Sequence, residues 1–159
     1  MAKKQRARNK KIRQIKKPLF WTGNVGPNSL NLPRVLLADD NPTVLEAVSR
    51  MLTPEFEIVG SVRDGTSLIE EARRLNPDVM IVDLFMPGLS GIEAARELKK
   101  RRISGCIIFL TVHHDLPFVE AAQVVGAMGY VLKSSADRDL VPAIREALQG
   151  HFFHSPSLQ

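Results

Sequence analysis

The sequence contains few of the features on which several classes of protein depend. Its 159 residues include a single cysteine, Cys106, which excludes an internal disulfide. No apolar stretch approaches the roughly 18 residues needed to cross a bilayer. The basic start also lacks the apolar segment of a secretory signal. From these absences we expect a cytoplasmic protein with no membrane insertion. Hydrophobic residues still make up 44% of the chain, enough for a core, so we expect one ordinary domain with tails.

Acidic residues are absent from the first 17 positions, which hold nine Lys or Arg. The rest of the chain has 13 Lys or Arg against 17 Asp or Glu, a balance of −4. Residues 1–17 are too charged to pack, and residues 18–32 have the Gly, Pro and Asn content of a linker. We therefore expect residues 1–32 to form a disordered basic arm and linker. Such an arm can bind nucleic acid electrostatically, although a solvated tail is the simpler interpretation.

From Pro33 onward, short apolar runs alternate with segments of helical period. The runs cover residues 34–38, 56–62, 78–82, 106–112 and 129–132, and the helical segments cover 42–52, 64–75, 91–101, 115–126 and 139–149. Near-continuous apolar runs are typical of strands covered on both faces, and parallel neighbours require crossover connections. The pattern predicts one α/β domain over residues 33–150, with a doubly wound, five-stranded parallel sheet.

Polar residues follow four of these predicted strands at the carboxyl end, where ligands bind in such sheets. They are Asp39, Asp40, Asp83, Thr111 and Lys133. Each alone has an ordinary interpretation, such as a helix cap for Asp40 or a turn residue for Asp83. The convergence of all five on one edge of a consistent topology is far more specific.

These side chains suit phosphoryl transfer. Three clustered carboxylates repel one another unless a cation intervenes, and Mg²⁺ binds carboxylate and phosphate oxygens. Lys133 offers a positive charge for a phosphate oxygen, and Thr111 offers a hydroxyl donor. Asp83 is then the natural nucleophile, because carboxylates can form covalent phosphoryl intermediates.

Three segments resemble the receiver domain of two-component response regulators: VLLADDN (35–41), VDLFMPGLSG (82–91) and GYVLK (129–133). The resemblance covers residues 33–150 and implies a flavodoxin-like (CheY-like) fold. It implies that Asp83 is the phospho-acceptor and that Thr111 and Lys133 assist it. Mg²⁺ would be held by Asp39, Asp40, Asp83 and the backbone carbonyl of Phe85. Thr111 and Tyr130 would form the switch.

The resemblance also implies partners. A sensor histidine kinase or phosphotransfer protein would donate the phosphoryl group, and a homodimer could follow. Residues 151–159 are similar to the receiver–output linker of NarL/FixJ-type transcriptional regulators, but the sequence ends at Gln159, where a helix-turn-helix domain would continue. The sequence departs from the family pattern at Val112 and at Ser134, where many receivers have a smaller residue and a proline.

Three functions therefore remain open. The leading hypothesis is a phosphorylation-dependent signalling switch that is not an enzyme in the ordinary sense. The second is a DNA-associated transcriptional regulator whose output domain is missing or is replaced by the basic arm. The third is a docking module that works without phosphorylation.

Overall fold

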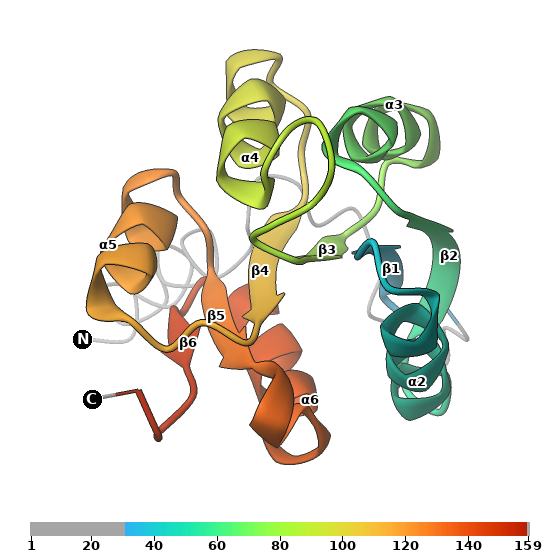
Figure 1. Ribbon diagram of the computed structural model, residues 1–159. Coiled ribbons are helices and arrows are strands. Elements are labelled where there is room, and N and C mark those ends of the chain that lie inside the picture. Colours follow the sequence, from blue (N-terminus) through green and yellow to red (C-terminus); the bar gives the residue numbers. More distant parts are fainter. Residues whose placement is uncertain (1–30, 159) are drawn as a thin grey trace, which may run out of the picture.

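The computed structural model describes residues 31–158 and contains one parallel sheet flanked by helices (Figure 1). Six strands pair in the order β2-β1-β3-β4-β5-β6, all parallel. Their bounds are β1 Arg34–Ala38, β2 Glu57–Val62, β3 Val79–Val82, β4 Cys106–Thr111, β5 Gly129–Leu132 and β6 Phe153–His154. The chain steps to both sides of β1, so the sheet is doubly wound as predicted.

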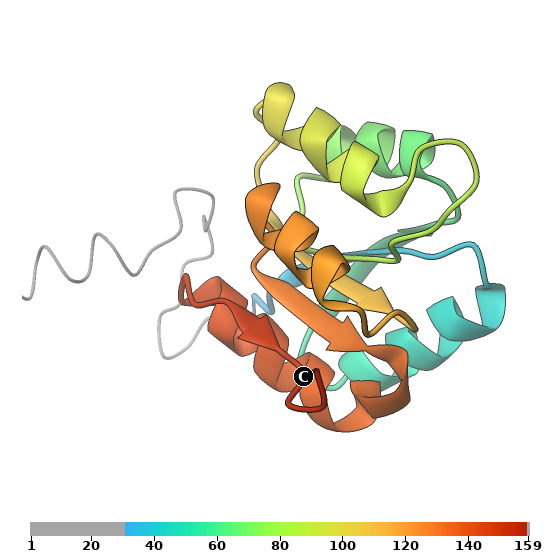
Figure 2. The ribbon, with the colours of Figure 1, turned by 60° about the vertical axis from the view of Figure 1, so that its left-hand side comes forward.

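Helices cover both faces of the sheet (Figure 2). Their bounds are α2 Pro42–Leu52, α3 Gly65–Leu75, α4 Gly91–Lys100, α5 Leu116–Val124 and α6 Ala136–Leu148, with a 3₁₀ turn, η1, at Lys133–Ser135. Apolar side chains of α3, α4 and α5 share one core cluster, and those of α2 and α6 share the other. Successive strand residues alternate between the two clusters, because side chains of a strand point to opposite faces. Among residues 31–158, no helix combines the length and apolarity that a bilayer crossing requires.

Local sequence signals explain where several helices begin. Asn41 accepts a hydrogen bond from the Thr43 amide and precedes Pro42, and Asp64 caps α3 in a similar way. Ser90 and Glu93 form a reciprocal capping box at the start of α4. These caps fix the helix ends that follow β1, β2 and β3, and so they position the loops at the carboxyl edge of the sheet.

The sequence predicted five strands, and the structure has a sixth. The backbone of Phe153–His154 pairs with β5, and the Ser155 amide donates to the Tyr130 carbonyl at 3.0 Å. The Ser155 hydroxyl is fully buried and accepts from the Leu132 amide at 3.1 Å. A two-residue strand gives no periodic signal in the sequence, which is why it was missed. The predicted basic arm, except for residues 31 and 32, lies outside the described residues.

Candidate functional site

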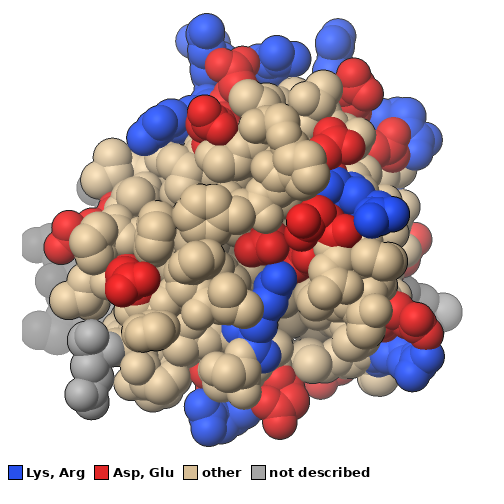
Figure 3. Space-filling view, in the orientation of Figure 1, with Lys and Arg blue, Asp and Glu red and all other residues tan. Residues whose placement is uncertain are grey.

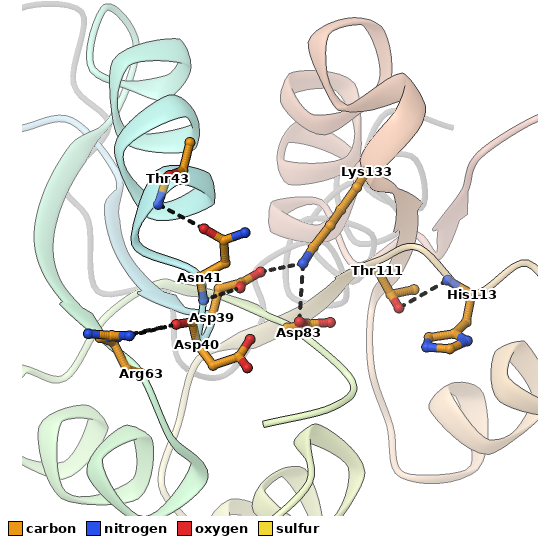
Figure 4. A network of polar contacts seen from close by, with 9 residues as sticks. All are labelled: Asp39, Asp40, Asn41, Thr43, Arg63, Asp83, Thr111, His113 and Lys133. Atoms are coloured by element: carbon orange, nitrogen blue, oxygen red, sulfur yellow. Dashed lines mark hydrogen bonds and ion pairs between the residues drawn. The ribbon is translucent and has the colours of Figure 1, made fainter. Parts of the chain in front are cut away.

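Side chains from four strand ends meet at the carboxyl edge of the sheet (Figure 4). Asp39 and Asp40 follow β1, Asp83 follows β3, Thr111 ends β4 and Lys133 follows β5. Because these strands are parallel neighbours, their carboxyl ends lie on one edge. The structure thus brings together all five residues that the sequence singled out.

Lys133 lies between two of the carboxylates. Its ammonium nitrogen is 2.6 Å from Asp39 Oδ2 and 3.1 Å from Asp83 Oδ2. Asp39 and Asp83 are only 4% and 8% exposed, so these contacts are shielded from water. Buried carboxylates require a partner, and the shared ammonium supplies one.

Asp40 completes a set of three carboxylates. Ligand oxygens from Asp39, Asp40 and Asp83 lie within 4.8 Å of one another, and Asp40 is exposed at the opening of the site. An all-oxygen set of this kind fits a hard divalent cation such as Mg²⁺, which binds through a few carboxylates and keeps several waters. When bound, the cation would neutralise charge on a phosphoryl group.

Burial and the pairing of Asp83 with Lys133 have opposite effects on the pKa values of these two groups. Removal from water raises the pKa of the Asp83 carboxyl, and the nearby Asp39 charge adds to this effect, while Lys133 opposes both. For Lys133, burial alone would lower the pKa. The hydrogen bond to Asp39 and the charge of Asp83 outweigh it, so the pKa of the ammonium is raised. The lysine is therefore held in its charged form beside a carboxylate that is costly to ionise.

The backbone around the carboxylates is fixed by short-range contacts. Asp39 Oδ1 accepts from the Asn41 amide at 2.9 Å, and the Asp40 carbonyl accepts from the Arg63 guanidinium at 3.0 and 3.2 Å. After β3 the chain passes so close to α4 that a Cβ at Gly91 would lie 2.2 Å from the Asp83 carbonyl oxygen. Only glycine permits this approach, which holds the Asp83 loop against the start of α4.

Thr111 and Tyr130 both contact the backbone of His113. Thr111 Oγ1 accepts from the His113 amide at 3.2 Å, and the Tyr130 hydroxyl donates to the His113 carbonyl at 2.7 Å. Thr111 and Tyr130 are fully buried, and burial raises the pKa of the tyrosine hydroxyl well above its ordinary range. The two predicted switch residues are therefore joined through one residue of the β4–α5 loop.

An aromatic cluster beside the site was not expected from the sequence. The Phe85 ring, 48% exposed, lies 4.6 Å from the His113 ring and 5.5 Å from Phe118 between centroids. The His113 and Phe118 rings are 5.3 Å apart. The position of His113 just after Thr111 was the available signal, but its partners come from two other segments.

The metal-binding role of the Phe85 carbonyl stays a prediction, and the Lys133–Ser134 peptide bond is trans.

Comparison with known proteins identifies the family. The model of the response regulator receiver domain matches residues 35–145. The transcriptional regulatory protein PdtaR of Mycobacterium tuberculosis is 40% identical over 116 residues, which are 72% of this chain and 56% of that protein. The nitrate/nitrite response regulator NarL of Escherichia coli is 34% identical over 126 residues, 78% of this chain and 58% of that protein. The chain thus spans little more than half the length of these relatives.

A solved structure gives the same result. A two-component response regulator of the LuxR family from Aurantimonas superposes with a TM-score of 0.76 at 34% identity, covering 80% of this chain and 93% of that one. The family model, matched at residues 35–145, covers β1 to β5 apart from Arg34 and covers the five helices apart from the end of α6. The chain therefore belongs to the response regulator receiver family, the signalling modules of two-component systems.

Proposed function

We propose that Asp83 accepts a phosphoryl group from a sensor histidine kinase or a phosphotransfer protein. The observation that carries the proposal is the position of Lys133, which is bonded to both Asp39 and Asp83 at the carboxyl edge of the sheet. A carboxylate nucleophile, a second carboxylate and a fixed ammonium are the groups that phosphoryl transfer to an aspartate requires.

In the transfer, an Asp83 carboxylate oxygen attacks phosphorus in line with the bond to the donor histidine. The new O–P bond forms as the P–N bond breaks, and the donor imidazole keeps the electron pair. Lys133 then exchanges its contact with Asp83 for one with a phosphoryl oxygen, while Asp39 keeps the ammonium in place. Mg²⁺, held by Asp39, Asp40, Asp83 and the Phe85 carbonyl, would neutralise the charge on the transferred group.

The signal leaves the site through Thr111 and Tyr130. The Thr111 hydroxyl turns to donate to a phosphoryl oxygen and gives up its contact with the His113 amide. Tyr130 already lies inward and is bonded to the His113 carbonyl, so movement of His113 changes the position of the loop that precedes α5. The surface of α5 would then differ between the two states and alter affinity for a partner or for a second copy of the chain.

The test is phosphorylation of the full chain by a small phosphodonor and by a histidine kinase. We expect a mass increase of one phosphoryl group that requires Mg²⁺ and is lost in Asp83→Asn. Asp78→Asn is the matched control, because Asp78 is also buried but lies at the other end of β3. Incorporation that persists in Asp83→Asn, or no incorporation from either donor, would contradict the proposal.

A second candidate function is association with DNA. It is favoured by the nine Lys or Arg among residues 1–17. Its test is salt-dependent DNA binding by the full chain that disappears when residues 1–17 are deleted. Unchanged binding after the deletion would exclude the arm as the site.

A further inference from the structure

Six cations gather where α3 and α4 end. They are Arg73 and Arg74 in the last turn of α3, Lys99 and Lys100 in the last turn of α4, and Arg101 and Arg102 directly after it. We call these six residues the basic edge. All six are exposed, and Figure 3 shows Lys and Arg atoms along the upper rim of the molecule, over α3 and α4. The two helix ends are tied together, because the Ser104 hydroxyl donates to Asn76 Oδ1 at 3.1 Å.

Neighbouring acids neutralise only part of this charge. Glu71 pairs with Arg74 at 2.7 Å, and Glu97 lies 3.3 Å from Arg101 and 3.9 Å from Lys100. In the part of the chain that the structure describes, Arg73, Lys99 and Arg102 have no ion pair. Cations at a helix C-terminus are favoured by the helix dipole, which accounts for one or two of them. It does not account for Arg101 and Arg102, which follow the helix.

Arg102 occupies a backbone conformation that does not suit it. Its φ is 56°, in the left-handed region where glycine or asparagine is the usual residue after a helix. The end of α3 has the same geometry, with φ of 49°, and the residue there is Asn76. The chain thus uses a suitable residue at one helix end and an arginine at the other. Arginine is less stable in this backbone conformation than glycine would be. Its presence there therefore indicates that its charge has a function.

The basic edge lies at the amino end of the strands, where the first 30 residues join the domain. The Arg34 side chain, at the start of β1, donates to the Leu75 carbonyl at 2.6 Å and the Asn76 carbonyl at 3.1 Å, at the end of α3. The basic edge therefore lies at the end of the sheet opposite to Asp83.

We propose that the basic edge binds the phosphate backbone of nucleic acid without reading its sequence. An evenly charged polymer is the partner that matches cations spread over two helix ends. A membrane surface fits less well, because interfacial binding combines cations with exposed apolar side chains. Among residues 31–158, the exposed large apolar residues lie away from the basic edge; they are Leu32, Phe85, Val112, Leu116 and Val124. The proposal does not depend on phosphorylation of Asp83.

The test is fluorescence anisotropy of the full chain with random-sequence duplex DNA at several salt concentrations. In Lys99→Ser/Arg102→Gly we expect binding to weaken roughly tenfold and the slope of log affinity against log salt to fall by about two. The matched control is Arg50→Ser/Arg145→Ser, which removes the same charge from exposed positions on α2 and α6. The control should retain affinity within about twofold.

Three results would overturn the proposal. Equal loss in both double variants would show that only net charge matters. Full binding in Lys99→Ser/Arg102→Gly would exclude the basic edge as the binding site. Binding to phosphatidylserine vesicles but not to DNA would replace nucleic acid with a membrane surface. Asp83→Asn should bind DNA as the unaltered chain does, so failure here is distinguishable from failure of the phosphorylation test.

Discussion

At the carboxyl end of the strands, Asp39, Asp83 and Lys133 are largely buried and bonded to one another, whereas at the amino end the six cations of the basic edge project into water. Charges in the first region interact across a medium of low polarity, so each one alters its neighbours' pKa and stability. Charges in the second region are screened, so each contributes little to folding and acts through their sum. Charged side chains are therefore expected to act on individual neighbours at one end and through their summed charge at the other.

The largest predicted difference between the two ends is in the free energy of unfolding when a single lysine is removed from one end or from the other. Lys133→Ala leaves Asp39 and Asp83 facing each other without a cation, and we expect it to lower the free energy of unfolding by about 3 kcal/mol at neutral pH. Lys99→Ala, on the exposed basic edge, should change it by less than about 0.5 kcal/mol. Urea denaturation of both variants measures the difference.

Magnesium makes this test more specific. Because the cation would take over part of the role of the missing ammonium, millimolar Mg²⁺ should restore part of the stability of Lys133→Ala and leave Lys99→Ala unchanged. Equal stability of the two variants without Mg²⁺ would mean that the buried ion pairs have no net effect on folding.

A second prediction concerns pH at the buried end. The pKa of Asp83 is raised above its ordinary value of 3.8, mainly by burial. The folded chain therefore binds this proton more tightly than the unfolded chain, and the ionised carboxylate lowers stability as pH rises above 3.8. Asp83→Asn removes the cost, so it should melt at a higher temperature than the unaltered chain near pH 7.

The sign of this difference is checked by lowering the pH. As Asp83 becomes protonated in both states, the advantage of Asp83→Asn should shrink and vanish below pH 3.8. Thermal melts without Mg²⁺ at intervals from pH 7 down to about pH 3 would measure it. An advantage that stays constant over the range would show that ionisation of Asp83 is not its cause.

The two ends also differ in how far the sequence predicts them. The alternation of apolar runs and helical segments predicted the doubly wound sheet, and because parallel strands share one edge it also predicted that Asp39, Asp83, Thr111 and Lys133 would meet. Contacts made by backbone atoms give no such signal. The strand at Phe153–His154 and the bonds of Thr111 and Tyr130 to His113 arise from tertiary placement of short segments.

The basic edge shows the same limit. The run of four cations at residues 99–102 is visible in the sequence, but its proximity to the end of α3 and to the start of β1 is not. The positive φ of Arg102 could not be predicted either, since the residue type argues against it. The left-handed backbone at Arg102 depends on how the chain turns after α4, where the Ile103 amide donates to the Leu98 carbonyl. The sequence does not show this turn.

The last prediction concerns Arg102, on the exposed basic edge, where a substitution should increase stability while it weakens binding. Arg102→Gly relieves the left-handed backbone, because glycine adopts a positive φ without the steric cost of a Cβ. We expect the free energy of unfolding to rise by about 0.5–1 kcal/mol, while affinity for random-sequence DNA falls by about threefold. Arg102→Lys should keep most of the affinity and gain no stability. If Arg102→Gly left DNA binding unchanged, the strain at Arg102 would have no connection with its charge, and the basic edge would end at the last turn of α4.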